Sequence, residues 1–242
     1  MTATVQPQTE LGPVRRVKHR PRRWPWALAL VLVLALAGGA YYVVRWTSVL
    51  GLKQVVVTGV SGSLADRVRA AVDVPIGTPL ITVEPAEVVA QVRAAVPEVE
   101  SVTALRKWPD AVLVTVTPRS AVAATQANGA WWLLDRYGVP YLKVGARPEK
   151  LLTVDLATPG PGDRATLGAI AVIRSLPKSV ASQVTAVVAR SPYRIVLSLT
   201  GGKTVIWGDD SQVEAKAKVL PVLLQQPGTT YDISDPTFAT VR

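Results

Sequence analysis

Few residues of this chain form patterns that could perform catalysis. A Gly-Lys-Thr string at 202–204 resembles the end of a phosphate-binding loop, but the first glycine of that motif would fall at Leu197, so a hairpin turn is favoured. Asp209 and Asp210 could bind a metal ion or act as a carboxylate pair. Two acids directly before a helix more often cap it and interact with its dipole, so we expect a structural role for both.

Residues that supply general bases or metal ligands are scarce. The single histidine, His19, lies in the N-terminal tail, and the chain has no cysteine. Trp131 and Trp132 could form a carbohydrate platform, but neighbours on a strand point to opposite faces, so at least one should belong to the core. A serine–lysine nucleophile pair stays open, although no serine lies in a recognisable elbow. We therefore predict no catalytic residue, no metal site, no cofactor and no small-molecule substrate.

The net charge does not indicate a protein that binds nucleic acid. The chain has 242 residues with 27 basic and 17 acidic side chains, a formal charge of +10. The tail 1–23 holds six basic residues and one acid, whereas the part from Trp46 onward holds 20 basic and 16 acidic residues. The C-terminal part is therefore only mildly basic and shows no basic stripe, so we expect no nucleic-acid partner.

The uncharged segment 24–44 is predicted to be a transmembrane helix. Its 21 residues would span about 31 Å as a helix, close to the ~30 Å hydrocarbon core of a bilayer. Basic residues gather before it and Arg45 alone follows it closely, so the positive-inside rule places the tail 1–23 in the cytoplasm and the rest outside. The alternative is a cleaved signal peptide, because the Ala-Leu-Ala string at 35–37 resembles a cleavage site. The apolar run continues past that string, which favours an uncleaved anchor.

Two folded units are predicted after this segment. Residues 50–118 show the order strand, helix, helix, strand, strand. The expected elements are strands at 52–60, 101–107 and 111–117 and helices starting near Ser63 and Pro85. A helix pair laid over a three-stranded sheet would bury one apolar face of each layer.

Residues 119–242 are predicted to form a larger β-rich domain with two or three helices. Strands are expected at 121–125, 131–135, 139–144, 151–156, 184–189, 194–199 and 203–207, and a helix at about 164–176. A capping box at Ser211 and Glu214 predicts a further helix to about Gln225. The segments 231–233 and 237–241 are expected to be extended. The fold class is therefore α+β with a single transmembrane helix.

Several strings, in this order, resemble the FtsQ/DivIB family of bacterial cell-division proteins. Residues 53–59 resemble the opening strand of the family's POTRA domain, and 97–102 its link from the second helix to the second strand. The Arg-Lys-Trp-Pro-Asp string at 106–110 is the most specific stretch, and 119–123 and 135–140 resemble segments of the family's β domain. By these strings, the basic tail and the single span, the chain is identified as a member of this family.

The resemblance implies a non-catalytic scaffold in the cytoplasmic membrane, concentrated at the division septum. FtsQ-like proteins recruit two small bitopic partners, of the FtsB (or DivIC) type and the FtsL type, and help control septal peptidoglycan synthesis. It also implies that the POTRA domain serves septal targeting and contacts other division proteins, and that the C-terminal strand edge binds the FtsB-type partner.

The C-terminal segment is thus the candidate partner-binding site. An exposed strand edge has unpaired N–H and C=O groups and can accept another chain's strand. The candidate residues are Tyr231, Asp232, Ile233, Ser234, Thr237, Phe238 and Thr240. The three large apolar members could instead fasten the last strands to the core. Pro236 cannot donate a ladder hydrogen bond and should interrupt the edge.

Two other classes of protein remain as alternatives. A membrane-anchored cell-wall enzyme would need catalytic acids or a metal site in the β-rich domain, and the shortage of histidine and cysteine opposes it. The second alternative is another POTRA-containing envelope assembly factor.

Overall fold

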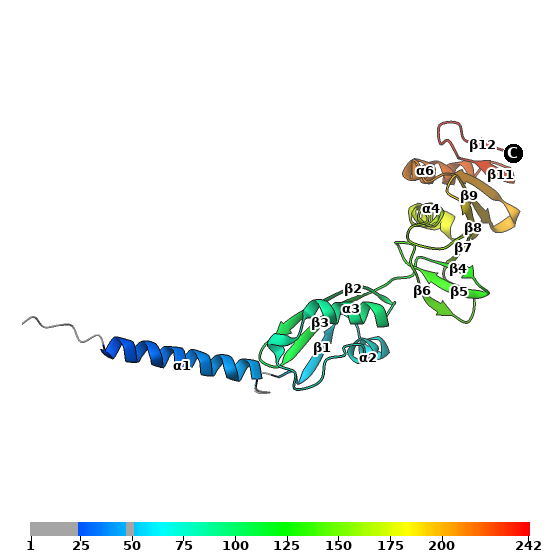
Figure 1. Ribbon diagram of the computed structural model, residues 1–242. Coiled ribbons are helices and arrows are strands. Elements are labelled where there is room, and N and C mark those ends of the chain that lie inside the picture. Colours follow the sequence, from blue (N-terminus) through cyan, green and yellow to red (C-terminus); the bar gives the residue numbers. More distant parts are fainter. Residues whose placement is uncertain (1–23, 47–50) are drawn as a thin grey trace, which may run out of the picture.

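The computed structural model describes residues 24–46 and 51–242, which form one long helix followed by two mixed αβ domains (Figure 1). Helix α1 (Trp24–Trp46) runs away from the first domain, and the second domain follows the first along the chain (Figure 1). The predicted basic tail, residues 1–23, lies outside the described residues.

Helix α1 covers the segment for which a transmembrane helix is predicted. It has 23 residues, and its apolar side chains that the structure describes, among them Leu28, Leu32 and Leu36, are exposed. Over the part of the chain that is described, no helix is both long enough and apolar enough to cross a membrane. The helical conformation agrees with the sequence, whereas membrane crossing stays a prediction.

The first domain has the predicted order of elements and a sheet in the order β1-β3-β2. Strand β3 is central, parallel to β1 and antiparallel to β2. Its alternation places Val112, Val114 and Val116 in a core that Val88 and Val92 of the second helix complete. The elements are β1 (Gln54–Thr58), α2 (Gly62–Ala70), η2 (Leu80–Thr82), α3 (Pro85–Ala95), β2 (Val99–Lys107) and β3 (Ala111–Pro118).

The second domain is built on a nine-stranded sheet in the order β12-β11-β10-β9-β8-β7-β4-β5-β6. It contains three α-helices and one short 3-10 helix, where the sequence predicted two or three helices. Its strands are β4 (Ala123–Ala127), β5 (Ala130–Leu134), β6 (Pro140–Val144), β7 (Leu152–Leu156), β8 (Val184–Ser191), β9 (Arg194–Leu199), β10 (Thr204–Gly208), β11 (Thr230–Asp232) and β12 (Thr240–Val241). Its helices are α4 (Arg164–Ser175), α5 (Lys178–Ala181), α6 (Val213–Leu223) and the short η3 (Thr200–Gly202).

Strands β4, β5 and β7 to β11 and helices α4 to α6 contribute buried residues to the second core. Alternate residues of the strands, such as Leu197, Val205 and Trp207, are fully buried there. From the helices, Ala169 and Leu220 join the same cluster. Strands β9 and β10 form the predicted antiparallel hairpin, and the Gly-Lys-Thr string at 202–204 leads from its turn into β10.

Three local predictions differ from the structure. Ser211 does not cap α6, because its hydroxyl and N–H donate to Asp209; the N-cap is Gln212, which makes no side-chain cap. Neither Asp209 nor Asp210 therefore caps that helix. Trp131 and Trp132 are both only half-buried, because β5 lies beside the edge strand β6.

The junction between the domains is braced by Arg119. Its N–H donates to the carbonyl of Glu98 at 2.8 Å, and its Nε donates to the carbonyl of Pro97 at 3.0 Å, both in the first domain. The same guanidinium forms an ion pair with Asp135 of the second domain. Arg136 adds a second cross-domain ion pair, with Glu100. The two domains are thus fastened to each other by charge-assisted hydrogen bonds.

Candidate docking edge of the β domain

The predicted docking segment contributes the last two strands of the nine-stranded sheet. Strand β11 is parallel to β10, and β12 is antiparallel to β11, with Tyr231 opposite Val241 and Asp232 opposite Thr240. Strand β12 is the outermost strand on this side of the sheet. The segment therefore lies at an edge with backbone groups available for another strand.

The hydrogen-bond register shows which groups face outward. Thr230 and Arg242 exchange both of their backbone hydrogen bonds, each at 2.9 Å. Because bonded and non-bonded pairs alternate in an antiparallel ladder, the next pair, Tyr231 and Val241, is non-bonded. The N–H and C=O of Val241 therefore point away from β11, in the direction from which a further strand would approach.

The three large apolar residues among the seven candidates separate into two groups. Tyr231 and Ile233 have no solvent exposure and belong to the core of the domain, so their side chains fasten β11 to the sheet. The hydroxyl of Tyr231 donates to the carbonyl oxygens of Gln226 and Gly228, at 3.0 and 2.9 Å. Phe238 is the opposite case and is 78% exposed. It is the large apolar candidate that the core does not use.

Two aspartates shape the loop that presents Phe238. Oδ1 of Asp232 accepts hydrogen bonds from the N–H and hydroxyl of Ser234, and Oδ1 of Asp235 accepts the same pair from Thr237. The two bonds from Thr237, first that of its hydroxyl and then that of its N–H, lower the pKa of the Asp235 carboxyl below its usual value.

The loop also corrects the prediction that 237–241 is extended throughout. Thr237 and Phe238 lie in a turn, and only Thr240–Val241 is strand. Hydrogen bonds between side chain and backbone compete with the ladder at Thr237. Pro236 lies in that turn, where the sequence predicted an interruption of the edge.

Lys216, a buried residue of helix α6, was not identified from the sequence. Its side chain has no solvent exposure, and its ammonium donates to the carbonyl oxygen and Oδ1 of Asp209, both at 3.1 Å. Hydrogen bonds from Ser211 and Lys216 lower the pKa of the Asp209 carboxyl to about 2. The only signal in the sequence was a lysine within the apolar stripe of a helix that also holds Val213, Ala217 and Leu220.

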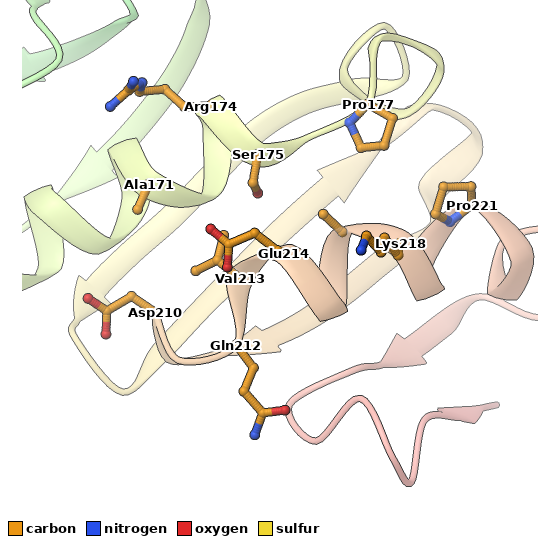
Figure 2. A pocket seen from close by; sticks show the side chains of 11 residues that line it. Ala171, Arg174, Ser175, Pro177, Asp210, Gln212, Val213, Glu214, Lys218 and Pro221 are labelled. Atoms are coloured by element: carbon orange, nitrogen blue, oxygen red, sulfur yellow. The ribbon is translucent and has the colours of Figure 1, made fainter.

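A groove of about 730 Å³ lies between α4 and α6, on the surface of the same domain (Figure 2). Its charged lining residues, Arg174, Asp210, Glu214 and Lys218, come from both sides (Figure 2). Ser175 also lines it, but its hydroxyl donates to the carbonyl of Val172 at 2.7 Å, one turn back in its own helix. The proton of this hydroxyl is therefore directed to a backbone carbonyl and not to a base.

The other candidate chemistry of the sequence is not assembled into a site. Among residues 24–46 and 51–242, no three His, Cys, Asp or Glu side chains gather where they could hold a metal ion. Trp131 and Trp132 line different hollows of the surface, so they do not form one platform.

The fold and this edge define a two-domain α+β protein whose larger sheet ends in a strand with outward-facing backbone groups. Comparison with known families matches residues 50–119 to the POTRA domain of the FtsQ type and residues 121–237 to the C-terminal domain of cell division protein FtsQ/DivIB. The chain belongs to the FtsQ/DivIB family of cell division proteins.

Individual relatives agree with this assignment. Cell division protein FtsQ of Mycobacterium leprae is 38% identical over 205 residues, which cover 85% of this chain and 59% of that protein. FtsQ of Mycolicibacterium smegmatis is 36% identical over 83% of this chain and 60% of its own length. FtsQ of Streptomyces bingchenggensis is 33% identical over 94% of this chain and 89% of its own length. The chain thus spans about three fifths of the length of the first two relatives.

A solved structure of a division protein also aligns with part of this chain. The major extracytoplasmic domain of the division protein DivIB from Geobacillus stearothermophilus, in its trans isomer, aligns with a TM-score of 0.35 and 12% identity, over 44% of this chain and 91% of that chain.

Proposed function

We propose that this chain is a non-catalytic scaffold of the division machinery. It recruits FtsB/DivIC-type and FtsL-type bitopic partners to the septum and through them helps control septal peptidoglycan synthesis. Family membership supports the division role. The observation that carries the scaffold role is the open edge of β12, with outward groups at Val241 beside the exposed Phe238.

The proposal includes a single membrane anchor at 24–44, with residues 1–23 in the cytoplasm and both domains outside. Its support is the charge distribution of the sequence and the 23-residue helix α1, in which no charged residue precedes Arg45. An anchor confines the two domains to a thin layer beside the membrane, which raises their effective concentration toward other bitopic proteins.

Docking would proceed by addition of a strand from the FtsB-type partner. Its backbone would bond the outward N–H and C=O of Val241, which supplies affinity with little dependence on sequence. An apolar partner side chain would cover Phe238, and this contact supplies specificity. The Asp235–Thr237 hydrogen bonds hold the loop before binding, which lowers the entropy that association would otherwise cost.

The opposite edge of the same sheet is less suited to this role. Strand β6 begins with Pro140, which has no N–H to donate, and carries Lys143 next to its last residue. Proline and lysine are the residues that blunt edge strands against pairing. The β12 edge has no such residue within the strand itself.

Partner capture tests the docking site directly. In the full-length chain, Phe238→Asp should abolish co-purification of the FtsB-type partner. The matched control is Tyr193→Asp, because Tyr193 is an aromatic residue of the same domain with 68% exposure, at the turn between β8 and β9. Undiminished capture by Phe238→Asp would place the docking site elsewhere.

Depletion tests the cellular role. Cells that lose the protein should become filaments with unfinished septa, and a tagged copy should concentrate at mid-cell. Normal division with the tagged protein spread evenly around the envelope would rule out the scaffold role.

A further inference from the structure

Three segments of the POTRA domain meet at the end where the chain arrives from α1. The N–H of Leu52 donates to the carbonyl of Thr78, and the N–H of Gly77 donates to the carbonyl of Leu52, both at 2.8 Å. On the other side, the N–H of Lys53 donates to the carbonyl of Asp110 at 2.8 Å. These bonds hold the loop before η2 and the β2–β3 turn beside the start of β1. We call this region, residues 51–53, 75–82 and 107–110, the α1-proximal end.

Large apolar side chains are exposed at the α1-proximal end. Ile76 is 70% exposed, Trp108 52% and Ile81 43%. They come from the loop, the β2–β3 turn and η2 respectively, so three separate segments present apolar groups at one end of the domain. Grouped apolar exposure of this kind marks an interaction surface rather than the scattered apolar residues of an ordinary surface.

Lysines accompany these apolar groups. Lys53 is exposed and forms an ion pair with Asp110 at 3.2 Å, while Lys107, also exposed, is in no ion pair within the described chain. Tryptophan, branched apolar residues and lysine together are the composition that the membrane–water interface favours, because rings and stems enter the apolar layer while ammonium groups reach the lipid phosphates.

The position of α1 brings this end close to a membrane. Helix α1 contacts η2, which carries Ile81. Helix α1 ends at Trp46 and the described first domain begins at Gly51, five residues on, so the connection can extend at most about 18 Å. If the segment 24–44 spans a bilayer as proposed above, the α1-proximal end cannot move far from the lipid head groups.

We infer that the α1-proximal end is a lipid-contact surface, in which Ile76, Ile81 and Trp108 enter the interfacial layer of the bilayer beside the phosphates met by Lys53 and Lys107. This inference rests on the proposed membrane anchor. The contact fixes the orientation of the POTRA domain relative to the membrane. Through the Arg119 brace it also limits the distance from the membrane at which the β12 edge is offered to a partner.

Site-specific lipid quenching tests the inference on the full chain. The chain has no cysteine, so single cysteines can be introduced and labelled with an environment-sensitive fluorophore. The positions are Ile76 in the proposed surface, Leu34 in α1 and Tyr193 in the β domain, each of which is exposed. The labelled proteins are placed in lipid nanodiscs of phosphatidylcholine and phosphatidylglycerol that contain no quencher, lipids with a quencher near the head group, or lipids with a quencher at the end of the acyl chain. Because only the lipids carry the quencher, quenching reports contact with lipid and not with another protein.

We expect the label at 34 to lose most of its fluorescence with the acyl-chain quencher and the label at 76 to lose most of its fluorescence with the head-group quencher, whereas the label at 193 should keep its fluorescence with both. Quenching at 34 without quenching at 76 would overturn the lipid-contact surface and leave the anchor intact. No quenching at 34 would overturn the anchor, and the inference with it. As a second variant, Trp108→Ala should reduce the quenching of the label at 76; an unchanged signal would remove Trp108 from the surface.

Discussion

Arg119 and Asp135 form an ion pair at the junction of the two domains, and the Asp135 side chain has no solvent exposure. The carboxylate also accepts hydrogen bonds from the N–H groups of Tyr137 and Val139, both at 2.9 Å. Arg119 in turn donates to the carbonyl of Pro97 in the POTRA domain. One guanidinium therefore neutralises a buried charge and joins two domains.

Replacing Arg119 should reveal the cost of that buried charge. Arg119→Ala leaves the Asp135 carboxylate without its cation, so we expect a loss of about 3 kcal/mol in the free energy of unfolding. Urea unfolding followed by tryptophan fluorescence measures it. Arg190→Ala is the control, because Arg190 and Asp155 form an exposed ion pair whose loss should cost much less. Equal effects of the two substitutions would contradict the role of burial.

The lowered pKa of the Asp209 carboxyl predicts that the folded chain loses stability in acid. Its pKa is lowered from 3.8 to about 2 in the folded chain, mainly by the hydrogen bonds of Ser211 and then Lys216. The stabilisation is therefore complete above about pH 4 and disappears as the pH falls to about 2. Because the carboxylate is 43% exposed, solvent screening reduces its contribution to about 1 kcal/mol. Asp209→Asn should be less stable than the parent at pH 7, and the difference should vanish near pH 2; a difference independent of pH would refute this assignment.

Two glycines of the POTRA domain offer a matched pair of substitutions. Gly59 has a φ of +87°, and a Cβ on it would lie 2.0 Å from the carbonyl oxygen of Val116 in the central strand. Gly62 has a φ of +62° but open space around it. We expect Gly59→Ala to destabilise the domain by about 3 kcal/mol or more and Gly62→Ala by about 1 kcal/mol, since only the first adds a clash to the backbone strain. Thermal unfolding compares them, and similar losses would contradict the close approach of β3.

If the outward N–H of Val241 bonds the partner strand, a variant that lacks this N–H should bind the partner more weakly. Val241→Pro removes that donor without removing a bond to β11, because Val241 lies in a non-bonded pair of the ladder. We expect partner affinity to fall about fivefold, the value of one hydrogen bond of about 1 kcal/mol. Titration of labelled partner peptide measures the change, and Val241→Thr, which keeps the N–H, is the control. If both variants bound equally well, strand addition at β12 would have to be abandoned.

The order of elements could be read from the sequence because local patterns determine it. The alternation of Val112, Val114 and Val116 predicted a half-buried strand, and the glycines near 202 predicted the β9–β10 hairpin. Both patterns depend on residues within a few positions of each other. The family resemblance was also recognised from short strings of sequence, and the resemblance in turn implied that the C-terminal segment lies at a sheet edge.

The tertiary structure decided which side chains of that segment are free. Tyr231, Ile233 and Phe238 are all large and apolar, and nothing in their own neighbourhood separates the two that enter the core from the one that stays exposed. The distinction depends on how β11 pairs with β10, a strand more than 20 residues earlier, and on the turn that Asp235 stabilises. The ion pairs Lys216–Asp209 and Arg119–Asp135 could not be predicted from the sequence for the same reason. Their charged groups come together only when the second domain and the domain junction have folded. Sequence periodicity reports which face of an element is apolar, whereas the partner that covers this face is set by packing between distant segments.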